Sequence, residues 1–427
     1  MNKKFWKYII PSMITFLVSG IYISVDGFFV GRTAGDMGLG SINIAWPLAA
    51  LILAVGTGIG MGGSVNISTH MGAGNKEKAD KALGNTIMLL LFSSIVLSLI
   101  LLFLGKPLLK LMGAEGDMLE LGNGYIKILA SGAIIQVFGT GITPLLRNQN
   151  KPWTAMVLML ANFAIDTTLS GVFVMLLGLG VKGAALATLA GQFIALVPAL
   201  AILFQKEHRI SSTCYKLHKD TIGHIIKVGI PVFGLSFIPS LTIVIINRQA
   251  IAYGGTTAIA GFAVVSYILS IGQLLLQGVG EGSQPLISFY YGANDLKAVK
   301  QLRKWTYTAA FTLSVIATAA IILLQGLIPR FFGVSPETAA VLQTALPICA
   351  LSLPLYAFSR ITSEYFNAVK ESRYAALMVY GEAFVLLPAS AILLPGFLNL
   401  NGVWGAIVLV QFLLLLAGLF LRMKSRI

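Results

Sequence analysis

Long apolar stretches separated by short polar loops run along the whole chain. A membrane-spanning helix needs about 20 mostly apolar residues, and the pattern predicts twelve of them. The first half holds stretches at Trp6–Val30, Ile42–Thr69, Leu83–Leu104, Gly124–Leu146, Trp153–Leu176 and Gly183–Phe204. The second half holds stretches at Ile222–Ile246, Ala258–Phe289, Trp305–Leu327, Ala339–Phe366, Tyr374–Leu394 and Val403–Leu421. We therefore expect an all-α polytopic membrane protein.

The composition agrees with a bilayer as the main solvent. Of the 427 residues, 56% are hydrophobic and only 11% are charged, whereas a soluble domain carries roughly a quarter charged residues. Lys3 and Lys4 precede the first stretch without a small-residue cleavage site, so we expect this helix to be retained. Cys214 and Cys349 lie far apart and match no metal-binding spacing. We expect a multi-pass protein of the inner (plasma) membrane.

Basic residues fall mainly in alternate loops. The net charge of +14 would suggest nucleic acid as a partner of a soluble protein, but here its placement encodes topology. Cytoplasmic loops of membrane proteins carry the excess of Lys and Arg. An even number of spans with both termini cytoplasmic satisfies this rule, and no nucleic-acid binding is expected. The basic loops contain Lys76, Lys78 and Lys81; Arg147 and Lys151; Lys206, Arg209, Lys216 and Lys219; Lys297, Lys300, Arg303 and Lys304; Lys370 and Arg373.

The two halves resemble each other. "GNKEKADKAL" (Gly74–Leu83) matches "ANDLKAVKQL" (Ala293–Leu302), with Asn75 against Asn294 at an offset of 219. Six spans in each half make corresponding spans point the same way, which predicts two pseudo-symmetric six-helix lobes related as a parallel repeat. We expect an N-terminal lobe at 1–204, a cytoplasmic linker at 205–220 and a C-terminal lobe at 221–427, in a monomer.

Two carboxylates inside predicted spans are the first candidates for chemistry. Asp26 and Asp166 are both intramembrane, and Asn162 shares the face of Asp166 because it precedes it by one helical turn. A charge at mid-bilayer costs roughly 2.5–3.5 kcal/mol even on the lenient insertion scale, so such groups usually serve function. With a hydroxyl from Thr167 or Thr188, they offer oxygen ligands for Na+, or a carboxyl group that carries H+. Alternatively, each Asp only bonds to neighbouring backbone or hydroxyl groups.

The repeat makes this site asymmetric, because Asp26 and Asp166 align with the apolar residues Ile245 and Val385. We therefore expect the cation chemistry in the N-terminal half. No ATP-binding motif or Cys/His metal cluster occurs, so the energy is expected to come from an ion gradient, without a cofactor.

Several further residues are candidates for a substrate cavity. Glu281 lies in "GVGEGSQP" and either meets a cationic substrate or is satisfied by Gln277 or Gln284 one turn away. Glu364 is expected to pair with Arg360. The glycine-rich "GTGIGMGGS" (Gly56–Ser64) predicts a close helix–helix contact. The remaining cavity candidates, for which ordinary packing is the competing interpretation, are Tyr22, Phe28 and Met159.

Four motifs in order resemble one known family. "VDGFFVGR" in the first helix, "NFAID" in the fifth, "GAALATLAGQ" (Gly183–Gln192) in the sixth and "GEGSQPLISFYYGA" (Gly280–Ala293) in the eighth are similar to multidrug and toxic compound extrusion (MATE) transporters, nearest to the bacterial DinF/MepA-like branch. The resemblance implies a twelve-helix transporter, not an enzyme, that exports lipophilic cationic amphiphilic drugs by alternating access in antiport with H+ or Na+. It also implies that Asp26, Asn162, Asp166 and Thr188 couple to the cation, with Na+ held at the first three.

Two other functions compete with this hypothesis. A lipid-linked oligosaccharide flippase of the same superfamily needs a cavity rich in Arg and Lys, whereas the spans here hold few cations, chiefly Arg248 and Arg360 near helix ends. A non-transporting scaffold or receptor would not need paired acids in one lobe.

Overall fold

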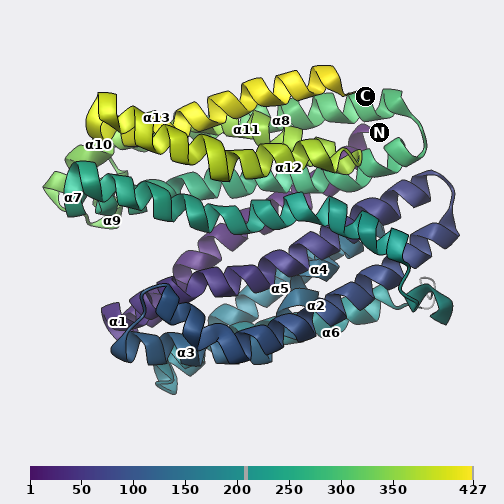
Figure 1. The fold of residues 1–427 in the computed structure, drawn as a ribbon, viewed down its shortest axis with the longest axis horizontal. Helices are drawn as coiled ribbons and strands as arrows, with labels where there is room; N and C mark the ends of the chain where they lie inside the picture. Colours follow the sequence, from purple (N-terminus) through teal and green to yellow (C-terminus); the bar gives the residue numbers. More distant parts are fainter. Residues whose placement is uncertain (206–209, 426–427) are drawn as a thin grey trace. The chain divides into compact units, whose positions relative to one another are not determined.

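The protein is helical throughout the part that the structure describes. The computed structural model describes residues 1–205 and 210–425, without the side chains of residues 23–28, 31, 35–36 and 256. Those residues contain no β-strand, which confirms the all-α prediction (Figure 1). In the first half the helices are α1 (Asn2–Gly72), α2 (Lys76–Leu111), α3 (Gly116–Ser131), α4 (Ala133–Asn148), α5 (Pro152–Ser170) with the π-helical extension η1 (Gly171–Leu176), and α6 (Gly180–Leu203).

A short 3₁₀ turn, η3 (Ser212–Tyr215), precedes the second half. The helices that follow are α7 (Lys219–Gly292), α8 (Leu296–Leu324), α9 (Ile328–Phe332), α10 (Pro336–Ala350), α11 (Ser352–Ala368), α12 (Ser372–Gly381) with the π-helical η4 (Glu382–Leu386), and α13 (Leu387–Lys424). The continuous label α7 covers two spans, Lys219–Gly255 and Thr257–Gly292, because the chain turns back at Gly255 (φ 64°). Likewise α1 contains the spans Asn2–Tyr22 and Met37–Gly72.

The number of crossings follows from length and composition. In the described residues, ten helical stretches are long and apolar enough to span a membrane, and the bent pair α3–α4 makes an eleventh. One of the ten, Ser372–Lys424, has 53 residues. As one straight helix it would be about 80 Å long, far beyond the bilayer core of about 30 Å. Its backbone leaves helical geometry at Asn399. Counted as two crossings, it completes the twelve spans that the sequence predicts.

The chain divides into two compact units. The first comprises Met1–Phe237 with Gly292–Asn294, and the second comprises Ile238–Tyr291 with the chain from Asp295 onward. In the first unit α1 contacts α2, α3, α4, α5 and α6, and in the second unit α11 contacts α8, α12 and α13. The first unit thus includes the start of α7. The lobe boundaries expected from the sequence stay a prediction.

The two halves repeat the same local geometry, at an offset of 220 residues. Asn75 caps α2 by accepting a hydrogen bond from the backbone of Lys78, and Asp295 caps α8 by accepting one from Ala298, both at 3.0 Å. The preceding residues, Gly74 (φ 71°) and Asn294 (φ 57°), take the left-handed conformation, which Gly and Asn adopt most readily. The predicted match of Asn75 with Asn294 at offset 219 is therefore wrong by one residue. At the corrected offset Asp26 and Asp166 still align in sequence with apolar residues, Ile246 and Leu386.

The fourth predicted span is broken. Instead of one helix at Gly124–Leu146, α3 and α4 meet at Gly132 with a bend of 62°. The break frees the carbonyl of Leu129, and the Gln136 side chain donates a hydrogen bond to it at 3.1 Å. In a membrane a freed backbone group needs such a partner because no water is there to supply one. A Cβ at position 132 would lie 2.5 Å from Leu189, so α6 also crosses closely at the break.

The glycine-rich part of α1 lies against its neighbours at backbone distance. A Cβ at Gly60 would approach the carbonyl oxygen of Gly141 in α4 to 2.3 Å, and one at Gly56 or Gly63 would collide with Thr140 or Thr86. The prediction of a close helix–helix contact at Gly56–Ser64 is confirmed. It brings α4 against α1 and so closes one wall of the cavity described next.

Candidate functional site

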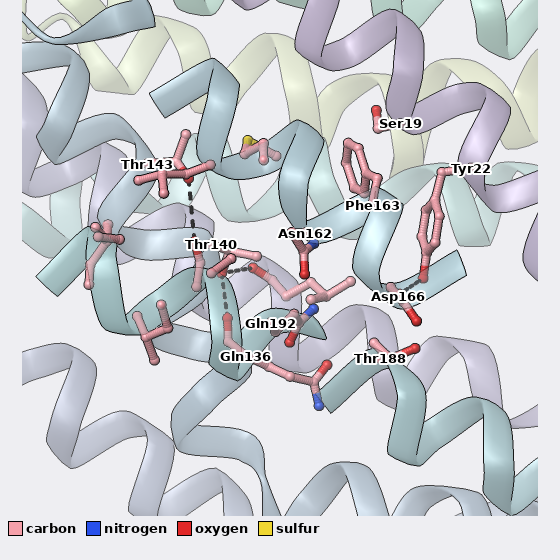
Figure 2. A pocket seen from close by; sticks show the side chains of 18 of the residues that line it. Ser19, Tyr22, Gln136, Thr140, Thr143, Asn162, Phe163, Asp166, Thr188 and Gln192 are labelled. Carbon is pink, nitrogen blue, oxygen red and sulfur yellow. Dashed lines mark hydrogen bonds between the residues drawn. The ribbon is translucent and has the colours of Figure 1, made fainter. Parts of the chain in front are cut away.

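A cavity of about 280 Å³ lies inside the first unit, among α1, α3, α4, α5 and α6. This volume is close to the lower end of the range for small-molecule sites, about 300–1,000 Å³. Most of the polar side chains in its wall come from α1, α4, α5 and α6 (Figure 2). They are Ser19 and Tyr22 of α1, Gln136, Thr140 and Thr143 of α4, Asn162 and Asp166 of α5, and Thr188 and Gln192 of α6.

Asp166 is the one charged side chain among the lining residues that the structure describes. It is 1% exposed. Its Oδ2 accepts a hydrogen bond from the Tyr22 hydroxyl, and its Oδ1 accepts a longer one, 3.5 Å, from Ser170. Gly191 of α6 makes this burial feasible, since a Cβ there would lie 2.9 Å from the Asp166 Cβ. The carboxylate is thus held between three helices, away from bulk solvent.

Two amide oxygens near Asp166 are buried without a hydrogen-bond donor. In the described residues neither Asn162 Oδ1 nor Gln192 Oε1 has a partner, and both side chains line the cavity alongside Thr188 (Figure 2). Buried polar atoms are nearly always satisfied, so an unsatisfied pair needs an explanation. Carbonyl, carboxylate and hydroxyl oxygens are the ligands that hard cations prefer. The donor set therefore fits a small hard cation. No cluster of three His, Cys, Asp or Glu occurs among the described residues.

The rest of the wall is apolar and aromatic. The Tyr22 ring stacks on Phe163, with ring centroids 5.0 Å apart and planes 20° apart. Met159 lies one turn before Phe163 on α5, and Trp46 and Tyr125 complete the aromatic lining. Such a wall suits the apolar body of an organic molecule, while the flexible Met side chain tolerates different shapes.

The structure brings five of the predicted site residues to one cavity: Tyr22, Met159, Asn162, Asp166 and Thr188. The side chains of Asp26 and Phe28 lie outside the described residues. Glu281 belongs to the second unit, where it is 4% exposed and its Oε1 accepts a hydrogen bond from Gln277 at 2.8 Å. The roles of all eight residues stay predictions.

Gln136 and Gln192 are two of the lining residues that sequence reasoning missed, and Ser19, Thr140 and Phe163 are among the others. Gln192 follows Thr188 by four residues and so shares its helix face, a spacing that the motif Gly183–Gln192 already displayed. Gln136 had no comparable signal, because its exposure to the cavity depends on the break at Gly132.

The second unit carries its own buried charges. Arg360 and Glu364 form an ion pair at 3.1 Å, with both side chains 3% exposed, which confirms the predicted pairing. In the same unit, the Gln411 amide donates to Glu382 at 2.7 Å and accepts from the Ser359 hydroxyl at 2.7 Å. These contacts tie α11, η4 and α13 together.

Comparison with known proteins identifies the family. A family model described as MatE matches residues 11–170 and 225–391. The chain belongs to the MatE family. Its relatives include the multidrug export protein MepA of Staphylococcus saprophyticus, 23% identical over 417 residues (96% of this chain and 91% of that protein), and MepA of Staphylococcus haemolyticus, 25% identical over 415 residues (95% and 90%). The resemblance to MATE transporters read from the sequence is confirmed.

Solved MATE structures share the fold of this MatE chain. A MATE protein in complex with MaL6 superposes with a TM-score of 0.93 at 26% identity, covering 99% of this chain and 96% of the other. An outward-facing multidrug resistance MATE transporter of the MOP superfamily superposes with a TM-score of 0.93 at 26% identity, covering 99% of this chain and 95% of the other. A MOP superfamily transporter from Pyrococcus furiosus superposes with a TM-score of 0.93 at 25% identity, covering 99% of this chain and 95% of the other. The reverse polarity of its binding pocket suggests a different function for that protein. This MatE chain is a polytopic membrane transporter, and transporters of its family are not enzymes.

Proposed function

We propose that this chain exports lipophilic cationic compounds from the cytoplasm across the plasma membrane, by alternating access and in exchange for H+ or Na+. The observation that carries the proposal is Asp166, a buried carboxylate and the one charged side chain among the described lining residues of the first-unit cavity. In a site of low dielectric, one fixed negative charge attracts a cation far more strongly than in water. The aromatic wall supplies contacts for the apolar body of the same molecule.

One carboxylate serves both substrate and coupling ion. When Asp166 takes up H+ or holds Na+ with Asn162 and Thr188, its negative charge is neutralised and a cationic drug loses its attraction. The two ligands therefore oppose each other through a shared site, and each lowers the affinity for the other by the same factor. Such mutual exclusion is what antiport requires. Asp26 is the expected second carboxylate of this site.

The flippase alternative needs a cavity lined by cations. Among the described lining residues of the first-unit cavity there is no Lys or Arg. A pyrophosphate group would therefore be repelled by the Asp166 carboxylate, and no described lining cation would offset that repulsion. MepA relatives of this chain are multidrug export proteins, and this supports drug export over lipid flipping.

Efflux of a fluorescent cationic dye from cells, or its uptake into inverted vesicles under an imposed pH or Na+ gradient, tests the proposal. We expect Asp166→Asn and Asp26→Asn each to abolish gradient-driven transport without loss of membrane insertion, because an amide cannot take up and release the coupling charge. Asp220→Asn, which removes an exposed carboxylate, is the matched control and should transport normally. Full transport by Asp166→Asn at normal expression would remove this residue from the mechanism.

Competition by paired analogues tests selection by charge in the same vesicles. A cationic dye should compete more than about tenfold better than an anionic one of equal size, since roughly 1.4 kcal/mol of differential interaction produces that factor. Equal competition by the two analogues would exclude acid-selected cation export and favour the flippase.

A further inference from the structure

A second cavity, of about 630 Å³, lies in the second unit where α8 begins and α13 ends. Its polar end carries four cations: Lys300, Arg303 and Lys304 of α8 and Arg422 of α13. Lys300 and Lys304 are one helical turn apart and so share one face of α8. The proposed transport function does not use this cavity.

The charge at this end has no acidic counterpart. None of the four cations forms an ion pair with a carboxylate in the described part of the chain. Instead, Arg303 lies 5.0 Å from the Tyr365 ring centroid and donates to the Tyr365 hydroxyl at 3.2 Å. Arg422 lies 5.4 Å from the ring centroid of Tyr307. Aromatic rings hold the two guanidinium groups in place, and the positive charge stays available to an anion.

The other end of the cavity is apolar. Phe311, Ala357 and Phe358 line it, and Phe311 is 58% exposed. The same face of α8 continues through Val315, which is 43% exposed, into the stretch that spans the bilayer. Basic residues thus lie at the end of a span, where the headgroups are, and apolar ones lie deeper, where the acyl chains are.

The equivalent face of the first unit is covered by the chain itself. At the repeat offset of 220, Lys304 corresponds to Gly84 of α2, and a Cβ at Gly84 would lie only 2.3 Å from the carbonyl oxygen of Cys214. The Asn85 side chain holds the segment around Cys214 against α2, because its amide donates hydrogen bonds to the carbonyl oxygens of Cys214 and Lys216 at 3.1 and 3.0 Å. In the second unit, the corresponding position on α8 lines a cavity instead.

We propose that this cavity binds an anionic phospholipid from the membrane leaflet at which α8 begins. The headgroup phosphate lies among Lys300, Arg303, Lys304 and Arg422, and an acyl chain lies along Phe311 and Phe358. The apolar wall is the reason for choosing a lipid over a free anion, because a soluble phosphate would leave the exposed Phe311 ring uncovered, whereas an acyl chain would cover it. The leaflet is the cytoplasmic one if the predicted topology holds, and anionic lipids are concentrated there.

Thermal unfolding of the purified full-length chain in detergent, titrated with lipid, measures the binding. We expect dioleoylphosphatidylglycerol to stabilise the protein in a saturable, salt-sensitive manner, and dioleoylphosphatidylcholine to do so much less. Lys300→Gln/Lys304→Gln should weaken the apparent affinity for phosphatidylglycerol by about fivefold for each cation removed. Lys76→Gln/Lys78→Gln, an equal loss of charge at the start of the repeat-related helix α2, should bind as the unmodified chain does.

Three results would overturn the proposal. The first is that phosphatidylcholine stabilises the protein as much as phosphatidylglycerol does. The second is that the Lys300/Lys304 variant keeps the full affinity for phosphatidylglycerol. The third is that soluble glycerol phosphate stabilises the protein as much as the lipid does, which would identify a free-anion site. If the double variant does not fold, Arg422→Gln near the end of α13 takes its place, with the same fivefold loss expected and unchanged affinity contradicting the proposal.

Discussion

At the scale of single residues, the described lining of the first-unit cavity combines one carboxylate with two amide oxygens that have no hydrogen-bond donor. Asp166 is hydrogen-bonded by Tyr22 and Ser170, whereas Asn162 Oδ1 and Gln192 Oε1 are buried and unpartnered in the described residues. Leaving a buried acceptor unsatisfied costs about 1–3 kcal/mol. A fold that keeps two such oxygens beside a carboxylate is well suited to recover that cost by binding a cation.

Asn162→Leu tests this interpretation at one atom. Removing the Oδ1 ligand while keeping the side-chain volume should raise the half-saturating concentration of the coupling cation by about tenfold, since a ligand interaction of 1–2 kcal/mol is lost. Cation-dependent dye transport in vesicles is the measurement. Thr168→Ala, on the exposed side of α5 where the hydroxyl only bonds to the Ala164 carbonyl at 2.8 Å, serves as control. An unchanged cation dependence in Asn162→Leu would exclude this oxygen as a ligand.

At the scale of elements, close approach of helices and one break shape the site. Gly60 lets α1 meet the backbone of α4, and the bend at Gly132 rotates the start of α4 so that Gln136, Thr140 and Thr143 line the cavity. Interfaces between membrane helices depend on such small residues because lipid offers no hydrophobic drive for association.

Gly60→Ala should therefore destabilise the fold. The added methyl group would meet the Gly141 carbonyl oxygen at 2.3 Å, and overpacking of this kind costs about 1–3 kcal/mol. We expect a clear fall in the thermal midpoint in detergent. Gly223→Ala, with open space around the new methyl group, should leave the midpoint unchanged or raise it slightly, since Ala favours a helix. Equal midpoints for the two variants would contradict the close contact.

At the scale of the whole molecule, an even number of crossings places the two ends of the chain on one side of the membrane. The described helices account for twelve crossings once Ser372–Lys424 is divided at Asn399. The positive-inside rule assigns that side to the cytoplasm, and this orientation remains a prediction.

Cysteine labelling checks it directly. In a background without Cys214 and Cys349, which are buried, Asn2→Cys and Lys424→Cys are both expected to react with an impermeant thiol reagent in inverted vesicles and to be protected in intact cells. Opposite behaviour of the two positions would show an odd number of crossings. Labelling of both in intact cells would keep the count and reverse the orientation.

The apolar pattern by itself determined the class of fold and the approximate place of the spans, although not the break in the fourth one. A helix in lipid satisfies its own backbone, so each span can be recognised from about 20 local residues. Local chemistry also pointed to Asn162 and Asp166, because a polar group within such a stretch is conspicuous and helical spacing sets which residues share a face. Thr188 was one of two candidate hydroxyls, and the family resemblance favoured it. The repeat was also visible in the sequence, but the predicted alignment was out of register by one residue. The equivalent helix caps are Asn75 and Asp295, which are different amino acids, so matching identical residues paired Asn75 with Asn294 instead.

Contacts between distant segments decided what the pattern could not show. The break at Gly132 depends on how closely α6 crosses there and on the Gln136 side chain that satisfies the freed carbonyl, so Gln136 joined the site only in three dimensions. Whether a polar side chain enters a cavity or bonds to a neighbour is likewise set by helices far apart in sequence: Tyr22 reaches Asp166 across 144 positions, whereas Glu281 is met by Gln277 on its own helix. Hydropathy is a property of one segment, and a site is made where several segments meet.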